Sequence, residues 1–249
     1  MKVLVVVPTL NERRNIELLV AGVLALGTSF TLLIVDDASA DGTAQAVAGL
    51  VPAYPGRLHL LRRRGRSGLG AAYRDGFRWG LERGYDFVCE MDADLSHDPA
   101  DLPRFIGTLV GGRADVLIGS RYVRGGTTPG WSASRRALSR VAGLATRGAL
   151  GVRVTDPTSG FRGYTRAALQ AIDVQTTLAE GFAFQVEVLC RCLSLGLRVV
   201  EMPISFRPRR SGRSKMTWRS AAEGLAVLWR LRSAGVASAG RSLPHHNPA

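Results

Sequence analysis

The sequence lacks the long apolar runs and the paired cysteines that mark several classes of protein. No stretch reaches the roughly 20 uninterrupted apolar residues of a transmembrane helix, because the best late candidate, residues 221–239, contains three charged residues. The three cysteines have no metal-ligand spacing and lie in apolar surroundings, which predicts buried core thiols. The apolar run after Met1 and Lys2 is too short for a signal-peptide core. We therefore expect a cytoplasmic protein that does not cross the bilayer.

Glycine is missing from the turn after the first expected strand, where dinucleotide-binding proteins carry a Gly-rich motif. The segment Gly68-Leu69-Gly70 follows the third expected strand instead. NAD and FAD are therefore not expected. Basic residues interleaved with stacking aromatics, a pattern typical of nucleic-acid-binding surfaces, are also absent from the sequence.

Positive charge is what the chain has in excess. Lys and Arg number 33 against 20 Asp and Glu, which gives a formal net charge of +13. This balance favours partners that carry phosphate, so nucleic acid, anionic lipid and a phosphorylated substrate are all candidates. Residues 207–215 together with Arg219 contain six basic residues and no acid, which fits attachment to an anionic membrane surface.

Short β-branched runs alternate with helical stretches along the first half of the chain. The expected strands are residues 3–7, 32–35, 58–61, 87–91 and 116–118. This alternation predicts an α/β fold with a mainly parallel sheet flanked by helices. We expect one catalytic domain over residues 1–232, ending in a helix at 217–231 that is either amphipathic and interfacial or packed on the core. A disordered tail is expected at 233–249.

Polar motifs follow four of these strands at the edge where ligands bind in open α/β sheets. Asp92-Ala93-Asp94 places two carboxylates one residue apart, which suits Mg²⁺ or Mn²⁺ bridging a diphosphate; the alternative is an Asx-type turn.

Other polar residues near this edge are also candidates. Asp37 can accept a hydrogen bond from a nucleobase or ribose, while Asp41 caps the next helix. His97 is either a metal ligand or a histidine at a helix start or behind the metal ligands. Gln185 and Glu187 either contact the sugar or the arginines, or are helix-end residues.

Together these segments resemble the family-2 inverting glycosyltransferases. The matching segments are Pro-Thr-Leu-Asn-Glu at 8–12, Val-Asp-Asp at 35–37, Asp-Gly-Thr at 41–43, Gly-Leu-Gly-Ala-Ala-Tyr at 68–73, Met-Asp-Ala-Asp at 91–94 and Ile-Gly-Ser-Arg-Tyr at 118–122. Three more resemble the dolichol- or polyprenol-phosphate mannose synthases: Asp-Pro-Thr-Ser-Gly-Phe-Arg at 156–162, Gly-Phe-Ala-Phe-Gln-Val-Glu at 181–187 and the Pro-, Arg- and Lys-bearing segment 203–215. The resemblance implies a GT-A fold that transfers mannose from GDP-mannose to a polyprenyl phosphate with inversion.

The resemblance also implies a role for individual positions. Pro8, Leu10, Glu12, Val35 and Asp37 would hold the nucleoside, Asp92, Ala93 and Asp94 the metal and diphosphate, and Arg209 and Lys215 the phosphates. Arg121, Arg135 and Ser139 would receive the lipid phosphate and, with Asp94, carry the catalysis. Two positions depart from the family pattern: Leu10 replaces an aromatic residue that stacks on the base, and Ser96 replaces a Gln ligand.

A phosphate acceptor needs orientation more than activation, because a phosphate monoester already carries about −1.5 to −2 charges at neutral pH. Because the acceptor is a lipid, the segment 207–215 is basic and no membrane span is expected, we expect a peripheral enzyme on the cytoplasmic face of the membrane. It acts with or without a separate membrane-protein partner. Two alternatives stay open at this point. One is a related transferase with another nucleotide-sugar such as UDP-glucose or a hydroxyl acceptor, and the other is a basic nucleic-acid-binding module. The sequence fixes neither mannose over glucose nor the length of the lipid.

Overall fold

The structure is a computed structural model that describes residues 1–209, apart from the side chains of residues 149, 150 and 182. The helix expected at 217–231, the tail expected at 233–249 and the predicted phosphate-binding residue Lys215 lie outside the described residues.

Seven strands form a single sheet in the order β3-β2-β1-β4-β6-β5-β7. Their bounds are β1 Val3–Thr9, β2 Phe30–Asp36, β3 Leu58–Arg62, β4 Phe87–Glu90, β5 Val116–Ser120, β6 Arg162–Thr165 and β7 Val199–Pro203. All neighbouring strands pair in parallel except β6, which runs antiparallel between β4 and β5. The central strands β1 and β2 are almost continuous apolar runs, as expected for strands covered on both faces.

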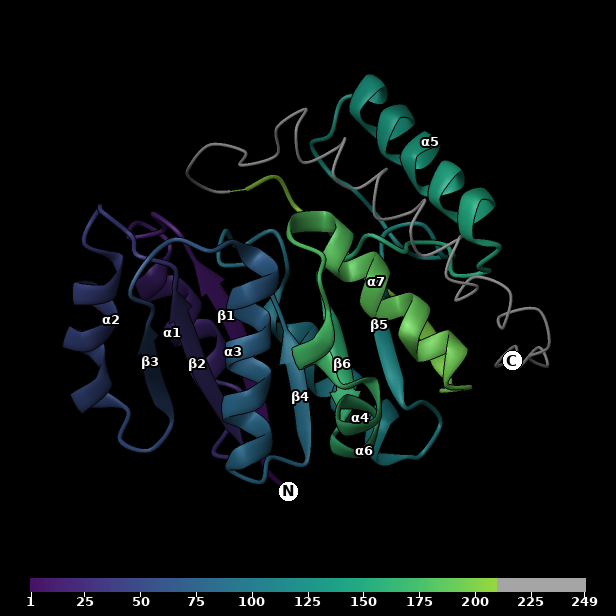
Figure 1. Cartoon of the computed structure of the whole chain (residues 1–249). Helices are drawn as coiled ribbons and strands as arrows, with labels where there is room; N and C mark the ends of the chain where they lie inside the picture. The colour runs from purple at the N-terminus through teal and green to yellow at the C-terminus, as the bar shows by residue number, and fades with distance from the viewer. Residues whose placement is uncertain (210–249) are drawn as a thin grey trace.

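Helices cover both faces of this sheet (Figure 1). One face packs against α1 Ile16–Leu24, α2 Thr43–Leu50 and α4 Leu102–Val110, and the other against α3 Leu69–Glu82, α6 Arg166–Ile172 and α7 Gly181–Ser194. Short 3₁₀ turns lie at Val51–Ala53, Pro99–Asp101 and Val174–Thr176. Helix α3 can lie close to β1 because Gly76 has no side chain. A Cβ atom added there would lie only 2.4 Å from Val6 Cγ1. The predicted α/β class and the two-sided packing are confirmed.

The five strands expected from the sequence are all present, but β6 and β7 were not expected. Arg162 and Gly163 begin β6, and Pro203 ends β7. Both strands are short, and the sequence of β6, Arg-Gly-Tyr-Thr, has no apolar alternation. The strand is specified by the neighbours on either side of it rather than by its own residues.

Helix α5, Ala133–Leu150, lies apart from the two layers at the top of the molecule (Figure 1). Three of its apolar side chains, Leu138, Val141 and Leu144, are 73%, 60% and 60% exposed. Within the described part of the chain, no helix has the length and apolar character needed to cross a bilayer. The three cysteines are free and buried, as predicted.

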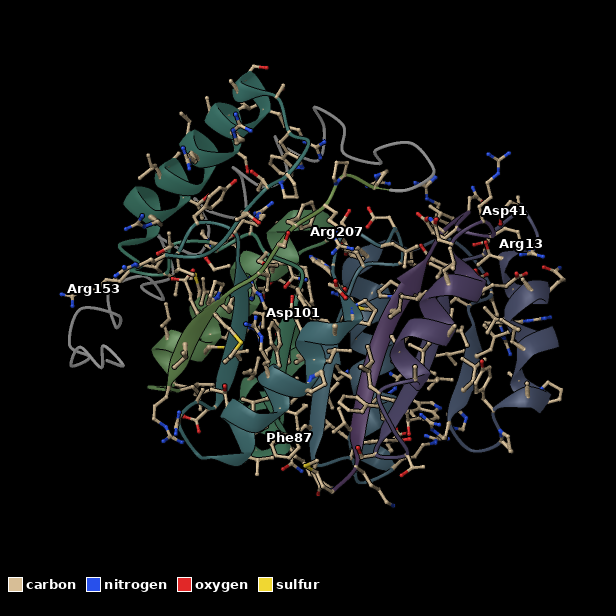
Figure 2. The ribbon with its side chains drawn as sticks, turned by 180° about the vertical axis from the view of Figure 1, so that it is seen from behind. Arg13, Asp41, Phe87, Asp101, Arg153 and Arg207 are labelled. Carbon is tan, nitrogen blue, oxygen red and sulfur yellow. The ribbon has the colours of Figure 1, made fainter. Side chains whose placement is uncertain are left out.

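The carboxyl ends of β1, β2, β4 and β5 lie at one edge of the sheet, as their common direction requires. Figure 2 shows Asp41 and Arg13 at this edge and Phe87, the first residue of β4, at the opposite end. The predicted convergence of the polar motifs on one edge is confirmed.

Candidate active site

The acidic turn Asp92-Ala93-Asp94 follows β4, and hydrogen bonds to its own backbone fix its shape. The Ser96 N–H donates to Asp94 Oδ1 at 3.0 Å, which is the Asx-type turn. His97 Nδ1 accepts the Asp92 N–H at 3.2 Å. Leu95 adopts a φ of 62°, a left-handed conformation that is uncommon for leucine and is found most often at functional sites. The turn leaves the Asp92 side chain 38% exposed at the edge of the sheet.

Negative charge is concentrated at this turn. Burial, together with the charges of Asp94 and Glu90, raises the pKa of the Asp92 carboxyl. The guanidinium of Arg209 pairs with Asp94 at 3.1 Å between Nη2 and Oδ2. Two neighbouring carboxylates are hard oxygen ligands that gain from a nearby cation. Two carboxylates of this kind would suit Mg²⁺ or Mn²⁺, which prefer oxygen ligands. Among the described residues, no three or more His, Cys, Asp or Glu side chains are placed together so as to hold a metal ion.

His97 supports the turn from below. Its ring stacks on Phe161 at 4.8 Å between centroids and meets Phe206 edge-on at 5.1 Å. Burial lowers the pKa of His97 to about 4, so the ring is neutral at physiological pH and Nδ1 accepts the Asp92 N–H. These contacts place His97 behind the turn, where its ring holds the Asp92 backbone.

A buried polar layer lies beneath the acidic turn. The Glu90 carboxylate accepts hydrogen bonds from the Tyr164 hydroxyl at 2.8 Å and the Gln185 carboxamide at 3.1 Å, and lies 3.6 Å from Arg162 Nε. Burial raises the pKa of Glu90 to about 7. Arg162 also donates to the backbone carbonyls of Pro157, Ser159 and Gln185. The layer therefore joins β4, β6, α7 and the loop that precedes β6.

Gln185 and Glu187, one residue apart in α7, play different parts. Gln185 belongs to the polar layer, and its Oε1 has no hydrogen-bond partner among the described residues. Glu187 accepts the backbone N–H groups of Leu178 and Ala179 and pairs with Arg191 at 2.8 Å. Glu187 lies in the middle of α7 and holds the backbone just before the helix, and its arginine partner is not one of the predicted acceptor residues.

The predicted nucleoside residues lie around the ends of β1 and β2. Asp37 pairs with Arg63 at 2.5 Å and accepts the N–H groups of Ser67 and Gly68 at 3.0 and 2.9 Å. Its carboxylate therefore already holds the loop that leads into α3. Glu12 is buried and accepts a hydrogen bond of 2.7 Å from Asn15.

Two of the predicted donor-site side chains point into the core. Val35 packs against α3 near Gly76, and Ala93 belongs to the core on the opposite face of the sheet. Alternation along the strand and the tight turn force these orientations. Any contact between these two residues and the donor would come from the backbone. Pro8 and Leu10 are half-buried at the end of β1.

Helix ends near this edge are closed by acidic side chains. Asp41 accepts the N–H groups of Thr43 and Arg13, both at 3.0 Å, so it caps α2 although Gly42 is the residue next to the helix. At the start of α3, Glu180 accepts the Ala71 N–H at 3.1 Å. With Asp37 bonded to Gly68, two backbone N–H groups at this helix start are already paired with acidic side chains.

On the acceptor side, Arg121 follows β5 and is held by a buried carboxylate. Its Nε and Nη2 donate to the two oxygens of Asp156 at 2.7 and 2.6 Å, and Nη2 also donates to Thr158 at 3.0 Å. Asp156 is 1% exposed, and the Arg121 side chain is 11% exposed. Arg121, which was predicted to receive the lipid phosphate, thus already has its Nε and Nη2 bonded to Asp156 and Thr158.

The other predicted acceptor residues come from α5 and lie close to Arg121. The guanidinium carbon of Arg135 lies 4.0 Å from the Trp131 ring centroid, and that of Arg121 lies 5.8 Å from the same centroid. Ser139 accepts a hydrogen bond of 2.5 Å from the Tyr122 hydroxyl. The guanidinium carbon of Arg121 also lies 5.4 Å from the centroid of Phe206, and the Phe206 ring meets His97 at the acidic turn with 5.1 Å between centroids. The structure thus brings Arg121, Arg135 and Trp131 together beside the acidic turn.

The segment after β7 links the two sides. Ile204 and Phe206 form backbone hydrogen bonds with Thr127 at 3.0 and 2.9 Å, and the Arg207 N–H donates to the Ser96 carbonyl at 3.0 Å. These bonds hold the segment beside the acidic turn, and Arg209, two residues further on, pairs with Asp94. Figure 2 shows Arg207 toward this end of the sheet.

Sequence reasoning missed Asp156, Trp131 and the pair formed by Glu90 and Arg162. Glu90 was detectable in principle, because an acid inside an apolar strand requires a buried partner. Asp156 and Arg162 are the first and last residues of the segment 156–162, which contributed only to the family resemblance. Trp131 has no sequence signal, because only the fold places it between two arginines.

The chain was compared with known proteins. Residues 4–173 match the model of the family described as glycosyl transferase family 2. The polyprenol monophosphomannose synthase of Mycolicibacterium smegmatis is 43% identical over 93% of this chain and 88% of the relative. The undecaprenyl-phosphate mannosyltransferase of Micrococcus luteus is 41% identical over 92% of this chain and 96% of the relative.

Solved structures of glucosyl-3-phosphoglycerate synthase from Mycobacterium tuberculosis share the fold. The complex with Mn²⁺, UDP-glucose and phosphoglyceric acid gives a TM-score of 0.69 at 21% identity, over 95% of this chain and 80% of that one. The complex with Mg²⁺ and UDP gives 0.67 at 21% identity, over 93% and 78%. The predicted GT-A architecture is confirmed. By the family match and the two curated relatives, the chain belongs to glycosyl transferase family 2.

Proposed function

We propose that this chain transfers mannose from GDP-mannose to a polyprenyl phosphate with inversion, giving polyprenyl-phosphate mannose. The observation that carries the proposal is the convergence of Arg121 and Arg135 on Trp131, with Arg121 also over Phe206, which packs on His97 of the acidic turn. A basic acceptor site next to a pair of carboxylates suits transfer to an anion. The names of the two curated relatives support the same lipid-phosphate chemistry.

On the donor side, Asp92 and Asp94 would hold Mg²⁺ or Mn²⁺ together with the diphosphate of the sugar nucleotide. The bound ion would supply positive charge that neutralises the departing diphosphate. Arg209 contacts Asp94 through one Nη atom and lies within reach of the same phosphates, where Lys215 would join it. Pro8, Leu10, Glu12, Val35 and Asp37 form the nucleoside side of this proposal.

On the acceptor side, a phosphate monoester arrives already ionised, so no general base is required. Arg121 and Arg135 would bind its oxygens, and Ser139 would add a hydrogen bond. Asp156 fixes the plane of the Arg121 guanidinium while leaving Nη1 for the ligand. One phosphate oxygen then attacks the anomeric carbon opposite the diphosphate, which inverts that centre.

Helix α5 supports a peripheral position at the cytoplasmic face of an anionic membrane. Its exposed apolar residues Leu138, Val141 and Leu144 recur at helical spacing. The helix contains four arginines and no acid. Apolar side chains can enter the interface while the arginines bind lipid headgroups, each contributing about 1 kcal/mol. The same helix carries Arg135, so this orientation would present the acceptor site to the lipid phosphate.

Product analysis tests the proposal. The full chain is incubated with Mg²⁺ or Mn²⁺ and farnesyl phosphate, with GDP-mannose in one set of reactions and UDP-glucose in another. We expect a mannosylated lipid phosphate from GDP-mannose and little product from UDP-glucose or with farnesol as acceptor. A glucosylated product would favour another nucleotide-sugar, and the lack of any lipid-linked product would overturn the proposal.

A further inference from the structure

Trp131 is buried at the acceptor side, and the hydrogen-bonding capacity of its ring is unused. Only 7% of the residue is exposed. Its indole Nε1 has no hydrogen-bond partner among the described residues. Buried N–H groups without an acceptor are rare in folded proteins because each loses its hydration without replacement. An unpaired donor of this kind points to a ligand oxygen.

The charged groups packed against this ring cannot supply that oxygen. Arg135 and Arg121 lie with their guanidinium carbons 4.0 and 5.8 Å from the ring centroid. A guanidinium has five N–H donors and no acceptor. The third neighbour, Phe206, meets the indole edge-on at 5.5 Å and has no polar side-chain atom. None of these three ring neighbours offers an acceptor to the indole N–H, and an anion bound by the two arginines would provide one.

The position of Trp131 in the chain adds to this preference for an anion. Ser132 caps α5 by accepting the Arg135 N–H at 3.2 Å, so Trp131 directly precedes the start of an 18-residue helix. The amino end of a helix carries a partial positive charge. The indole face also restricts Arg135, whose exposed side chain would otherwise lose more conformational entropy on binding.

We propose that Trp131 is a binding residue for the acceptor of this enzyme. Its indole N–H donates to an oxygen of the phosphate monoester that Arg121 and Arg135 bind through charge, and its ring holds Arg135 in place. This inference rests on the proposed function and adds a neutral, directional donor to two cations. The ligand class is a phosphate monoester and not the diphosphate of the donor.

The test follows the indole N–H signals of the full chain by ¹⁵N NMR. The sequence has four tryptophans, at 79, 131, 218 and 229, so the Trp131 signal is identified by its loss in Trp131→Phe. If that variant does not fold, the same signal is identified by elimination in Trp79→Phe, Trp218→Phe and Trp229→Phe. The wild-type chain is then titrated separately with farnesyl phosphate, with farnesol and with GDP plus Mg²⁺.

We expect the Trp131 signal to move downfield with farnesyl phosphate and to stay in place with farnesol and GDP. Trp131→Phe should raise the dissociation constant for farnesyl phosphate about tenfold and leave that for GDP unchanged. Trp79→Phe is the matched control, because Trp79 also stacks with an arginine, Arg83 at 4.2 Å, and lies near Tyr85 at the other end of the sheet.

Three results would overturn the inference. If farnesyl phosphate binds and the Trp131 signal does not move, the assignment fails while the proposed acceptor stands. If GDP moves the signal, the indole serves the donor. If farnesyl phosphate does not bind the wild-type chain at all, the proposed acceptor fails and this assignment fails with it.

Discussion

The buried ion pair between Arg121 and Asp156 allows a quantitative test of how the acceptor side is built. Replacing Asp156→Asn preserves the shape of the side chain but leaves the Arg121 guanidinium without its counter-charge. Removing one partner of a buried pair costs about 3 to 5 kcal/mol. Asparagine keeps one acceptor oxygen for the Arg121 N–H or Nε, so we expect the lower end, about 3 kcal/mol. For a chain of this size, that loss lowers Tm by about 6 to 12 °C.

The assay is thermal unfolding with and without inorganic phosphate. The unpaired guanidinium should bind phosphate more strongly, so phosphate should restore more of the Tm in the Asp156→Asn variant than it adds to the wild type. Asp115→Asn is the matched control, because Asp115 forms the same two-pronged pair with Arg198, whose side chain is 56% exposed. Solvent screens that pair, and little change in Tm is expected. An equal Tm loss in both variants, or no added effect of phosphate, would refute the reasoning.

Further predictions concern metal, packing, membrane and thiols. Asp94→Asn should abolish sugar transfer with an unchanged circular dichroism spectrum, and excess chelator should do the same to the wild type. Gly76→Ala should lower the free energy of unfolding by about 1 to 3 kcal/mol because its Cβ meets Val6, whereas Gly107→Ala on α4, with nothing within 4 Å, should raise it by about 0.5 to 1 kcal/mol in denaturant titrations. Changing the three exposed apolar residues of α5 to serine should weaken sedimentation with anionic vesicles while preserving turnover of farnesyl phosphate. Iodoacetamide at pH 8 should label no cysteine until the chain unfolds, because burial raises the pKa of Cys190 to about 11 and those of Cys89 and Cys192 to about 12.

Much of the fold was predictable because its central strands are long apolar runs with polar residues at one end. The run in β1 and the acids after β2 and β4 fix the direction of the sheet and the edge where the site lies. Strand β6 escaped prediction because a four-residue segment that contains Arg162 and Gly163 carries no periodic signal. Its pairing depends on β4 and β5, which come from distant parts of the chain.

The candidate site, like the fold, was predictable from the sequence only in part. The pair Asp92 and Asp94 was predictable because only Ala93 separates the two and they follow a buried strand. The partner of Arg121 was not, because Asp156 lies 35 residues away and reaches it through a loop conformation. Val35 differs from both. The motif at 35–37 predicted that it contacts the nucleoside, but strand alternation turns its side chain into the core.

Strand β6 has a consequence for how this architecture can diversify. Arg162 stands opposite Glu90 of β4 on one side and Ile118 of β5 on the other, so one reversed strand locks the base of the acidic turn to the strand that leads to Arg121. The spacing between the donor and acceptor halves is therefore built into a rigid frame. Helix α5 and the connection 204–209 border this frame without being part of it, so their residues can change without altering that spacing.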